Sequence, residues 1–232
     1  MRYYDLSPRQ LEQKAEELLL KFDEERLTKI KPIDVYAVID KCLHVPYDWK
    51  YLTPDQSVLG ATAFSDGLIW VWPESRYYEG LLPYQVGVEK GTILIDTTLT
   101  EGDNRGRENF TVMHEIFHQV LHKRCFLSMG KNYIFPTYKR TIEGKIKCSD
   151  YAMRVIERQA NACAAAFLMP AELTKSEYIK RLKSTRNKYY QHDIVWDIIK
   201  DMANDFSVSQ QAMSYRLQNF GLINENRENQ LK

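Results

Sequence analysis

The chain has 232 residues, of which 44% are hydrophobic, so it is long enough to bury one sizeable core. Its 32 Lys and Arg residues balance 31 Asp and Glu residues, so the net charge gives no indication of a polyanionic partner. No apolar run reaches the roughly 20 residues that a membrane span needs, and the first residues lack the apolar core of a signal peptide. We therefore expect a cytoplasmic protein without a membrane partner.

Two helices are expected near the start of the chain. Residues 8–30 carry apolar side chains at helical spacing, and Ser7-Pro8 supplies an N-cap followed by proline in the first turn. A second helix is expected at residues 33–43, where apolar residues again share one face. We interpret both helices as scaffold that packs on the core.

A small sheet is expected next, because the spacing of the apolar residues changes. Residues 59–64 and 68–72 predict two strands joined by a short connection, in which Gly67 would take a left-handed conformation. Residues 91–96 predict a third strand. Trp70 within this region fits a sheet face or the core better than a substrate pocket.

Residues 107–122 contain a complete His-Glu-x-x-His motif, formed by His114, Glu115 and His118. Residues four apart lie on the same face of a helix, so the two imidazoles can reach one metal ion. Glu115 would lie beside that ion, where its carboxylate could take a proton from water. The motif alone is also compatible with a buried amphipathic helix whose histidines only form hydrogen bonds.

A catalytic zinc site usually has three protein ligands and an open fourth position, so a third ligand is needed. The Ala-rich segment 157–170 predicts a helix on which Glu157 and Asn161 share a face. Glu157 could bind the metal while Asn161 accepts a hydrogen bond from a ligand imidazole. His122 is the alternative third ligand, although three ligands on one straight helix would span roughly 12 Å. Otherwise His122 would cap the C-terminus of its helix.

The remaining segments predict no further catalytic residue. Residues 124–150 form an insertion between the two motifs, which could be a lid, a docking surface or a short hairpin over the core. Residues 202–217 predict two helices joined by a turn and capped by Ser209, which resembles a helix-turn-helix. Arg216 is the only cation that the second of these helices offers to a DNA phosphate, so we do not expect DNA binding.

Together, segments 110–122 and 157–170 resemble the ImmA/IrrE family of zinc metallopeptidases. The resemblance covers roughly residues 55–172, and both family motifs occur in the right order. It implies one Zn²⁺ with three protein ligands, which would be His114, His118 and Glu157. It also implies a catalytic base, which would be Glu115. Two positions depart from the family pattern, because Phe117 replaces a usual glycine and Cys163 replaces a phenylalanine.

The resemblance implies an α+β, zincin-like fold with a small twisted sheet, a metal-binding helix pair and a C-terminal helical segment. We expect a metallopeptidase domain at residues 1–172, a helix-turn-helix-like segment at 173–223 and a frayed tail at 224–232.

The same resemblance implies a function in gene regulation. ImmA/IrrE peptidases with an assigned role typically inactivate a helix-turn-helix repressor, in a mobile element or a stress response. The implied reaction is therefore site-specific cleavage of such a repressor. The alternative is a regulator that binds DNA or protein and keeps a non-catalytic zinc site. The oligomeric state does not follow from the sequence.

Overall fold

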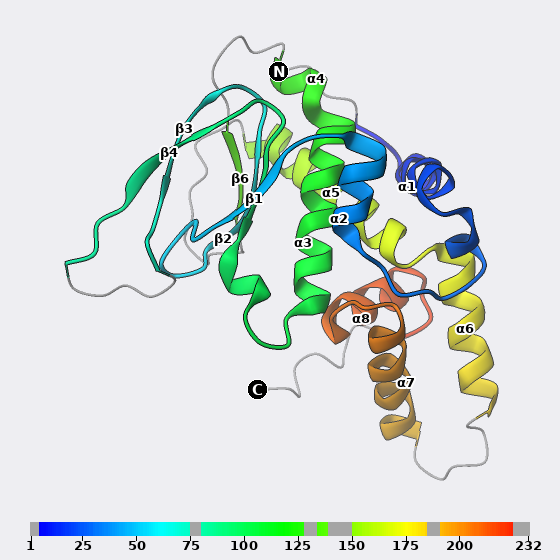
Figure 1. Ribbon diagram of the computed structural model, residues 1–232. Coiled ribbons are helices and arrows are strands. Elements are labelled where there is room, and N and C mark those ends of the chain that lie inside the picture. The colour runs from blue at the N-terminus through cyan, green and yellow to red at the C-terminus, as the bar shows by residue number, and fades with distance from the viewer. Residues whose placement is uncertain (1–4, 75–79, 128–133, 139–149, 185–190, 225–232) are drawn as a thin grey trace.

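The computed structural model describes residues 5–74, 80–127, 134–138, 150–184 and 191–224. Strands lie on one side of the molecule and most helices on the other, with α3 next to the strands (Figure 1). The helices are α1 (Pro8–Phe22), α2 (Val35–Val38), α3 (Arg105–Phe117), α4 (Lys123–Leu127), α5 (Asp150–Leu168), α6 (Ala171–Ser184), α7 (Gln191–Asp205) and α8 (Gln210–Asn219). The strands are β1 (Tyr47–Lys50), β2 (Val58–Ala63), β3 (Gly67–Val71), β4 (Tyr84–Val88), β5 (Ile93–Asp96) and β6 (Ile134–Tyr138).

The main sheet has the strand order β1-β5-β2-β6, in which β1 is parallel to β5 and the other pairs are antiparallel. A second, two-stranded sheet pairs β3 with β4. The expected hairpin between residues 59–64 and 68–72 is therefore wrong, although both strands exist. Every residue of β2 is buried, which suits a central strand, whereas β3 alternates between less and more exposed residues. Gly67 begins β3 and does not have a positive φ.

The first helix begins as predicted and ends early. The Ser7 hydroxyl accepts from the backbone N–H of Gln10, whose side chain accepts in return from the backbone of Ser7, so a complete capping box starts α1. At Asp23 the backbone becomes extended, with φ of −164°. The Asp23 carboxylate then caps a short 3₁₀ helix, Glu24–Leu27. The single helix expected over residues 8–30 is thus two shorter helices.

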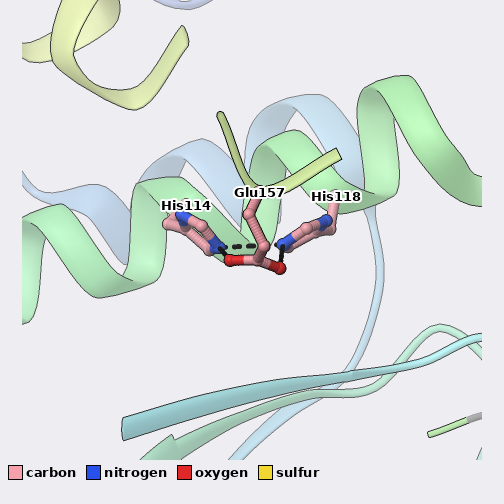
Figure 2. A group of neighbouring side chains, drawn as sticks. All are labelled: His114, His118 and Glu157. Carbon is pink, nitrogen blue, oxygen red and sulfur yellow. Dashed lines mark hydrogen bonds and ion pairs between the residues drawn. The ribbon is translucent and has the colours of Figure 1, made fainter. Parts of the chain in front are cut away.

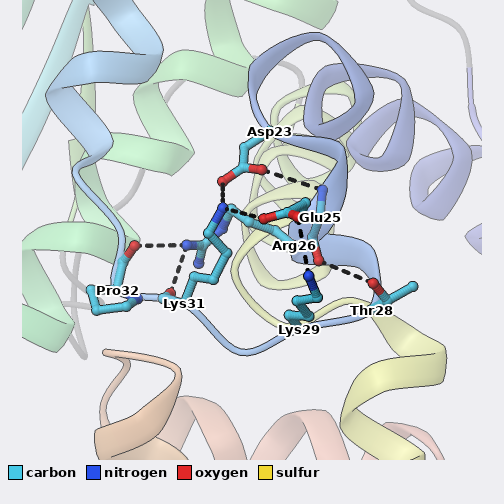
Figure 3. A network of polar contacts seen from close by, with 7 residues as sticks. All are labelled: Asp23, Glu25, Arg26, Thr28, Lys29, Lys31 and Pro32. Carbon is cyan, nitrogen blue, oxygen red and sulfur yellow. Dashed lines mark hydrogen bonds and ion pairs between the residues drawn. The ribbon is translucent and has the colours of Figure 1, made fainter.

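A buried arginine explains why the chain turns there (Figure 3). Arg26 donates to the carbonyl oxygens of Lys31 and Pro32, at 2.6 and 2.8 Å. The Lys31 amino group lies 2.6 Å from a carboxylate oxygen of Asp23. Continuing the helix would remove these carbonyl groups from the guanidinium and leave a buried charge without partners.

Within the insertion at 124–150, residues 124–127 continue α4 and residues 134–138 form a strand of the main sheet. Residues 134–138 form β6, which pairs with β2 and places Pro136 opposite Ala61. Proline has no N–H to donate, which suits an edge strand. A lid is therefore wrong for these five residues, whereas the docking surface and the hairpin stay predictions. Residues 128–133 and 139–149 lie outside the described part of the chain.

The helix that carries the His-Glu-x-x-His motif, here called the motif helix, is longer than expected and changes from α-helical to π-helical geometry part of the way along. After α3, residues His118–His122 are π-helical, and α4 continues to Leu127. Met113 and Phe117 are fully buried, as the apolar stripe predicts, whereas Val120 is exposed. Val120 lies inside the π-helical turn, where successive residues are rotated less than in an α-helix, so α-helical spacing no longer places it on the apolar stripe.

The C-terminal helices share the core of the rest of the protein. Buried residues of α6, α7 and α8 belong to the same apolar cluster as residues of α1, α3 and α5; from the C-terminal helices these include Leu173, Met202, Met213 and Leu217. The predicted cap is present, because the Ser209 hydroxyl accepts from the N–H of Ala212. The predicted division at residue 172 and the tail at 224–232 stay predictions, and residues 225–232 lie outside the described part. Among the described helices, none has the length and apolar character to cross a membrane.

The turn between α7 and α8 packs directly on the start of α3. At Gly106, an added Cβ would lie 2.5 Å from the backbone carbon of Val208, so the two backbones approach too closely for a side chain. Next to this contact, the Asn109 amide donates to the carbonyl oxygen of Ser207 at 2.9 Å. The C-terminal turn and the motif helix are therefore fitted to each other.

Arg216, the one cation considered for DNA, points into the protein. Its side chain is 5% exposed and forms two hydrogen bonds with the Glu12 carboxylate, at 2.6 and 2.8 Å. It also donates to the carbonyl oxygen of Met169. The guanidinium thus connects α8 to α1 and to the end of α5, and it is not available to a phosphate.

We predict that Arg216→Ala lowers the free energy of unfolding by about 3 kcal/mol, because it leaves Glu12 and a buried carbonyl without their donor. Urea denaturation measures this change. Lys29→Ala is the control, since its ion pair with Glu25 is largely exposed and its loss should change the free energy of unfolding far less. Equal effects of the two substitutions would contradict the structural role of Arg216.

Candidate metal centre

Three side chains from two separate helical segments converge on one point (Figure 2). The Nε2 atoms of His114 and His118 lie 2.8 Å apart. Each lies 3.3 Å from one carboxylate oxygen of Glu157, which comes from α5. All three residues offer a ligand atom within 4.8 Å of the others, so together they could hold a metal ion. His122 is not part of this group.

Close packing of α5 on α3 brings Glu157 to the histidines. Small, fully buried residues of α5, including Ala160 and Ala164, belong to the same apolar cluster as Met113 and Phe117 of α3. Phe117 and Phe167 fill the same interface, with ring centroids 6.2 Å apart. Of the two departures from the family pattern, Phe117 lies in the packing between α3 and α5, whereas the thiol of Cys163 donates to the carbonyl oxygen of Leu11 in α1, so neither contributes a donor atom to the group.

The charges in the site suit a cation. Burial acts to raise the pKa of Glu157, but its contacts with His114 and His118 outweigh burial and hold the pKa well below the usual range. For His114, burial acts to lower the pKa, and the adjacent Glu157 carboxylate raises it overall. Glu157 Oε1 is buried and, among the described residues, its near polar neighbour is Nε2 of His118 at 3.3 Å, without the geometry of a full hydrogen bond. A metal ion bound here would satisfy this oxygen, so the donor set fits a metal.

Asn161 orients the first histidine. Its Oδ1 atom lies 2.9 Å from Nδ1 of His114. Because an amide oxygen only accepts, Nδ1 carries the proton, and the lone pair of Nε2 faces the other two donors. The structure thus places Asn161 against the imidazole of His114, a contact that its spacing from Glu157 predicts.

His122 contacts Nδ1 of His118, on the opposite side of that ring from His114 and Glu157, and it does not cap a helix. It is buried, with Nδ1 3.0 Å from Nδ1 of His118 and Nε2 3.1 Å from Oε1 of Gln159. Burial and the neighbouring His118 lower the pKa of His122 to about 3, so it is neutral near neutral pH. The C-cap prediction is wrong, because the helix continues into α4. Gln159 was not predicted, because it lies off the helix face that Glu157 and Asn161 share.

Glu115 is fully buried between the motif helix and strand β2. The Thr62 hydroxyl donates to Oε2 of Glu115 at 2.6 Å. Gly60 allows this approach, since a Cβ at that position would lie 2.6 Å from Oε1 of Glu115. Neither Thr62 nor Gly60 was predicted as part of the site. Both belong to a strand whose only signal in the sequence was its apolar character.

A mixed α+β fold with a His-Glu-x-x-His helix beside a second, glutamate-bearing helix defines the class of zincin-like metallopeptidases. Residues 79–218 match the family model of peptidase M78, described as the IrrE N-terminal-like domain. The chain belongs to this family. The resemblance found in the two motifs is confirmed, and the matched region extends beyond residue 172 through most of the C-terminal helices. No curated protein matches the chain.

Proposed function

We propose that the protein is a zinc-dependent peptidase, with one Zn²⁺ held by His114, His118 and Glu157. The convergence of these three side chains is the observation that carries the proposal. Among the described residues, the group has three members and no fourth protein ligand, and a catalytic zinc ion characteristically keeps one position for water. A closed structural zinc site would need a fourth ligand.

Glu115 is proposed as the catalytic base. When bound, zinc supplies Lewis acidity towards a water molecule and the scissile carbonyl. The Glu115 carboxylate takes a proton from the attacking water and later gives it to the leaving amine as the C–N bond breaks. The hydrogen bond from Thr62 restricts rotation of the Glu115 carboxylate. The carboxylate is therefore already oriented before the substrate binds.

We expect an extended substrate to add as a strand along the sheet edge near the metal. Strand β2 contacts Glu115, but both of its edges are occupied, by β5 and by β6. Among the described strands, β6 is the edge strand that neighbours β2. A substrate strand on this side would therefore pair with β6.

The rival function is a DNA- or protein-binding regulator with a non-catalytic metal site. The buried ion pair of Arg216 with Glu12 occupies the one cation that α8 could offer to a DNA phosphate. Metal content does not separate the two functions, because both include zinc. Proteolysis and DNA binding assayed in parallel on the same preparation do separate them.

For the substrate, we propose a helix-turn-helix repressor that is cut at one exposed site. The proposal rests on the family, and it requires recognition by surfaces outside the metal site, because a few residues at the metal cannot select one protein. Strand β3 offers such a surface, since Leu68 and Trp70 lie on one of its faces and are 63% and 57% exposed. Exposed apolar groups of this kind commonly mark a contact with another protein.

We predict that the purified protein cleaves a cognate helix-turn-helix repressor, sought among the products of neighbouring genes, and leaves casein largely intact. Incubation of both substrates with the zinc-loaded protein, followed by mass spectrometry of the fragments, checks this. The Glu115→Gln variant serves as the control for contaminating proteases. Rapid digestion of casein with an untouched repressor would overturn the regulatory role and leave a general protease.

A further inference from the structure

Three side chains form a continuous hydrogen-bonded chain that ends at the group of His114, His118 and Glu157. Gln159 on α5 contacts Nε2 of His122, and Nδ1 of His122 contacts Nδ1 of His118. The three side chains are buried, with exposures of 2% for Gln159 and His122 and 0% for His118. The far end of the chain is Nε2 of His118, the atom that faces His114 and Glu157.

The direction of these hydrogen bonds decides where the proton of His118 lies. The Gln159 oxygen accepts, so His122 carries its proton on Nε2 and has a lone pair on Nδ1. That lone pair can only accept, so His118 must carry its proton on Nδ1. Nε2 of His118 is then left with a lone pair directed at the metal group.

The reverse direction is incompatible with metal binding. If the Gln159 amide donated instead, His122 would carry its proton on Nδ1 and His118 would carry its proton on Nε2. A protonated Nε2 cannot be a metal ligand. His114 is held in its metal-binding tautomer by Asn161, a residue that the sequence singles out, whereas His118 depends on a partner two side chains away.

We propose that Gln159 and His122 are positioning residues that set the tautomer and ring orientation of His118 for the metal. The inference rests on the proposed metal site, but the relay can be tested in the metal-free protein. Because partners of this kind typically change metal affinity by roughly 10- to 100-fold, the effect should be measurable.

The first measurement is the tautomeric state of the histidines in the apoprotein. NMR spectra of ¹⁵N-histidine-labelled apoprotein at alkaline pH distinguish nitrogens that carry a proton from those that do not. We expect His118 protonated on Nδ1 and His122 protonated on Nε2. A wild-type apoprotein with His118 protonated on Nε2 would overturn the proposal. This readout does not depend on activity.

The second measurement is zinc affinity by competition with a chelator. Gln159→Met removes the acceptor and should weaken zinc binding by roughly 10-fold or more, with a mixture of His122 tautomers. Gln159→Glu can only accept at this position, so it should keep the wild-type tautomers and bind zinc at least as tightly. Weak binding by Gln159→Glu, with altered tautomers, would contradict the proposed direction.

Gln119 provides the matched control. It is another buried glutamine close to the histidines, and its amide donates to the carbonyl oxygen of Gly91. Gln119→Met should change zinc affinity by less than about 2-fold, since the contact does not involve an imidazole. Equal losses in Gln119→Met and Gln159→Met would show a general packing effect and overturn the relay. A wild-type protein that shows the expected tautomers but binds no zinc would contradict the proposed function and not the proposed hydrogen-bond direction.

Discussion

Glu115→Gln is expected to reduce peptide hydrolysis by roughly 100-fold or more while the metal stays bound. Glutamine keeps the size of the side chain, and its amide oxygen can still accept the hydrogen bond from Thr62. It cannot take a proton from the attacking water, so the base is lost without a cavity or an unpaired Thr62 hydroxyl. Single-turnover cleavage of the cognate substrate and zinc content of the same sample measure the two halves of the prediction.

Thr62→Val is the matched control for this experiment. It removes the hydrogen bond to Oε2 and leaves the carboxylate in place, so hydrolysis should fall less than in Glu115→Gln. Unchanged turnover in Glu115→Gln would exclude Glu115 as the base. Loss of zinc in this variant would instead indicate that Glu115 supports the metal site.

Glu157→Ala is expected to abolish tight zinc binding, because it removes the only ligand of the group that does not come from the motif helix segment. The loss should exceed the roughly 10- to 100-fold effect of removing an outer hydrogen-bond partner. The purified variant, dialysed against a weak chelator and analysed for metal, should contain little zinc. Lowering the pH should weaken zinc binding in the wild type, since the imidazoles must be neutral to bind.

Asn161→Ala is the graded control, because it removes only the partner of His114 Nδ1. Its zinc affinity should fall between those of the wild type and Glu157→Ala. Full zinc content in Glu157→Ala would reject this residue as the third ligand. His122, the alternative considered from the sequence, would then have to be tested as a direct ligand.

The sequence predicts the centre of this site well, because helical spacing alone brings His114 and His118 to one face. The second helix follows from its Ala-rich composition, and the structure brings Glu157 and Asn161 to the histidines. These predictions depend on local geometry that a helix repeats regularly. The roles of these residues in binding and catalysis stay proposals.

What the sequence does not predict depends on contacts between distant segments. The pairing of β2 with β5 and β6, instead of with β3, is decided by burial on both faces of β2. The contacts of Thr62 with Glu115, and of Gln159 with His122, join segments more than 30 residues apart. The early end of α1 depends on carbonyl groups that surround Arg26 only after the chain has turned.

The close contact between Gly106 and Val208 bears on how a smaller working version of this protein could be made. A fragment that ends at residue 172 would lack the turn between α7 and α8, which packs on the start of the motif helix at Gly106. It would also leave Asn109 without the carbonyl oxygen of Ser207 as its partner. The apolar residues of the shared core would also lose their neighbours from the last three helices. The shortest autonomous catalytic unit should therefore retain the chain through α8, and trimming is better directed at other parts of the molecule.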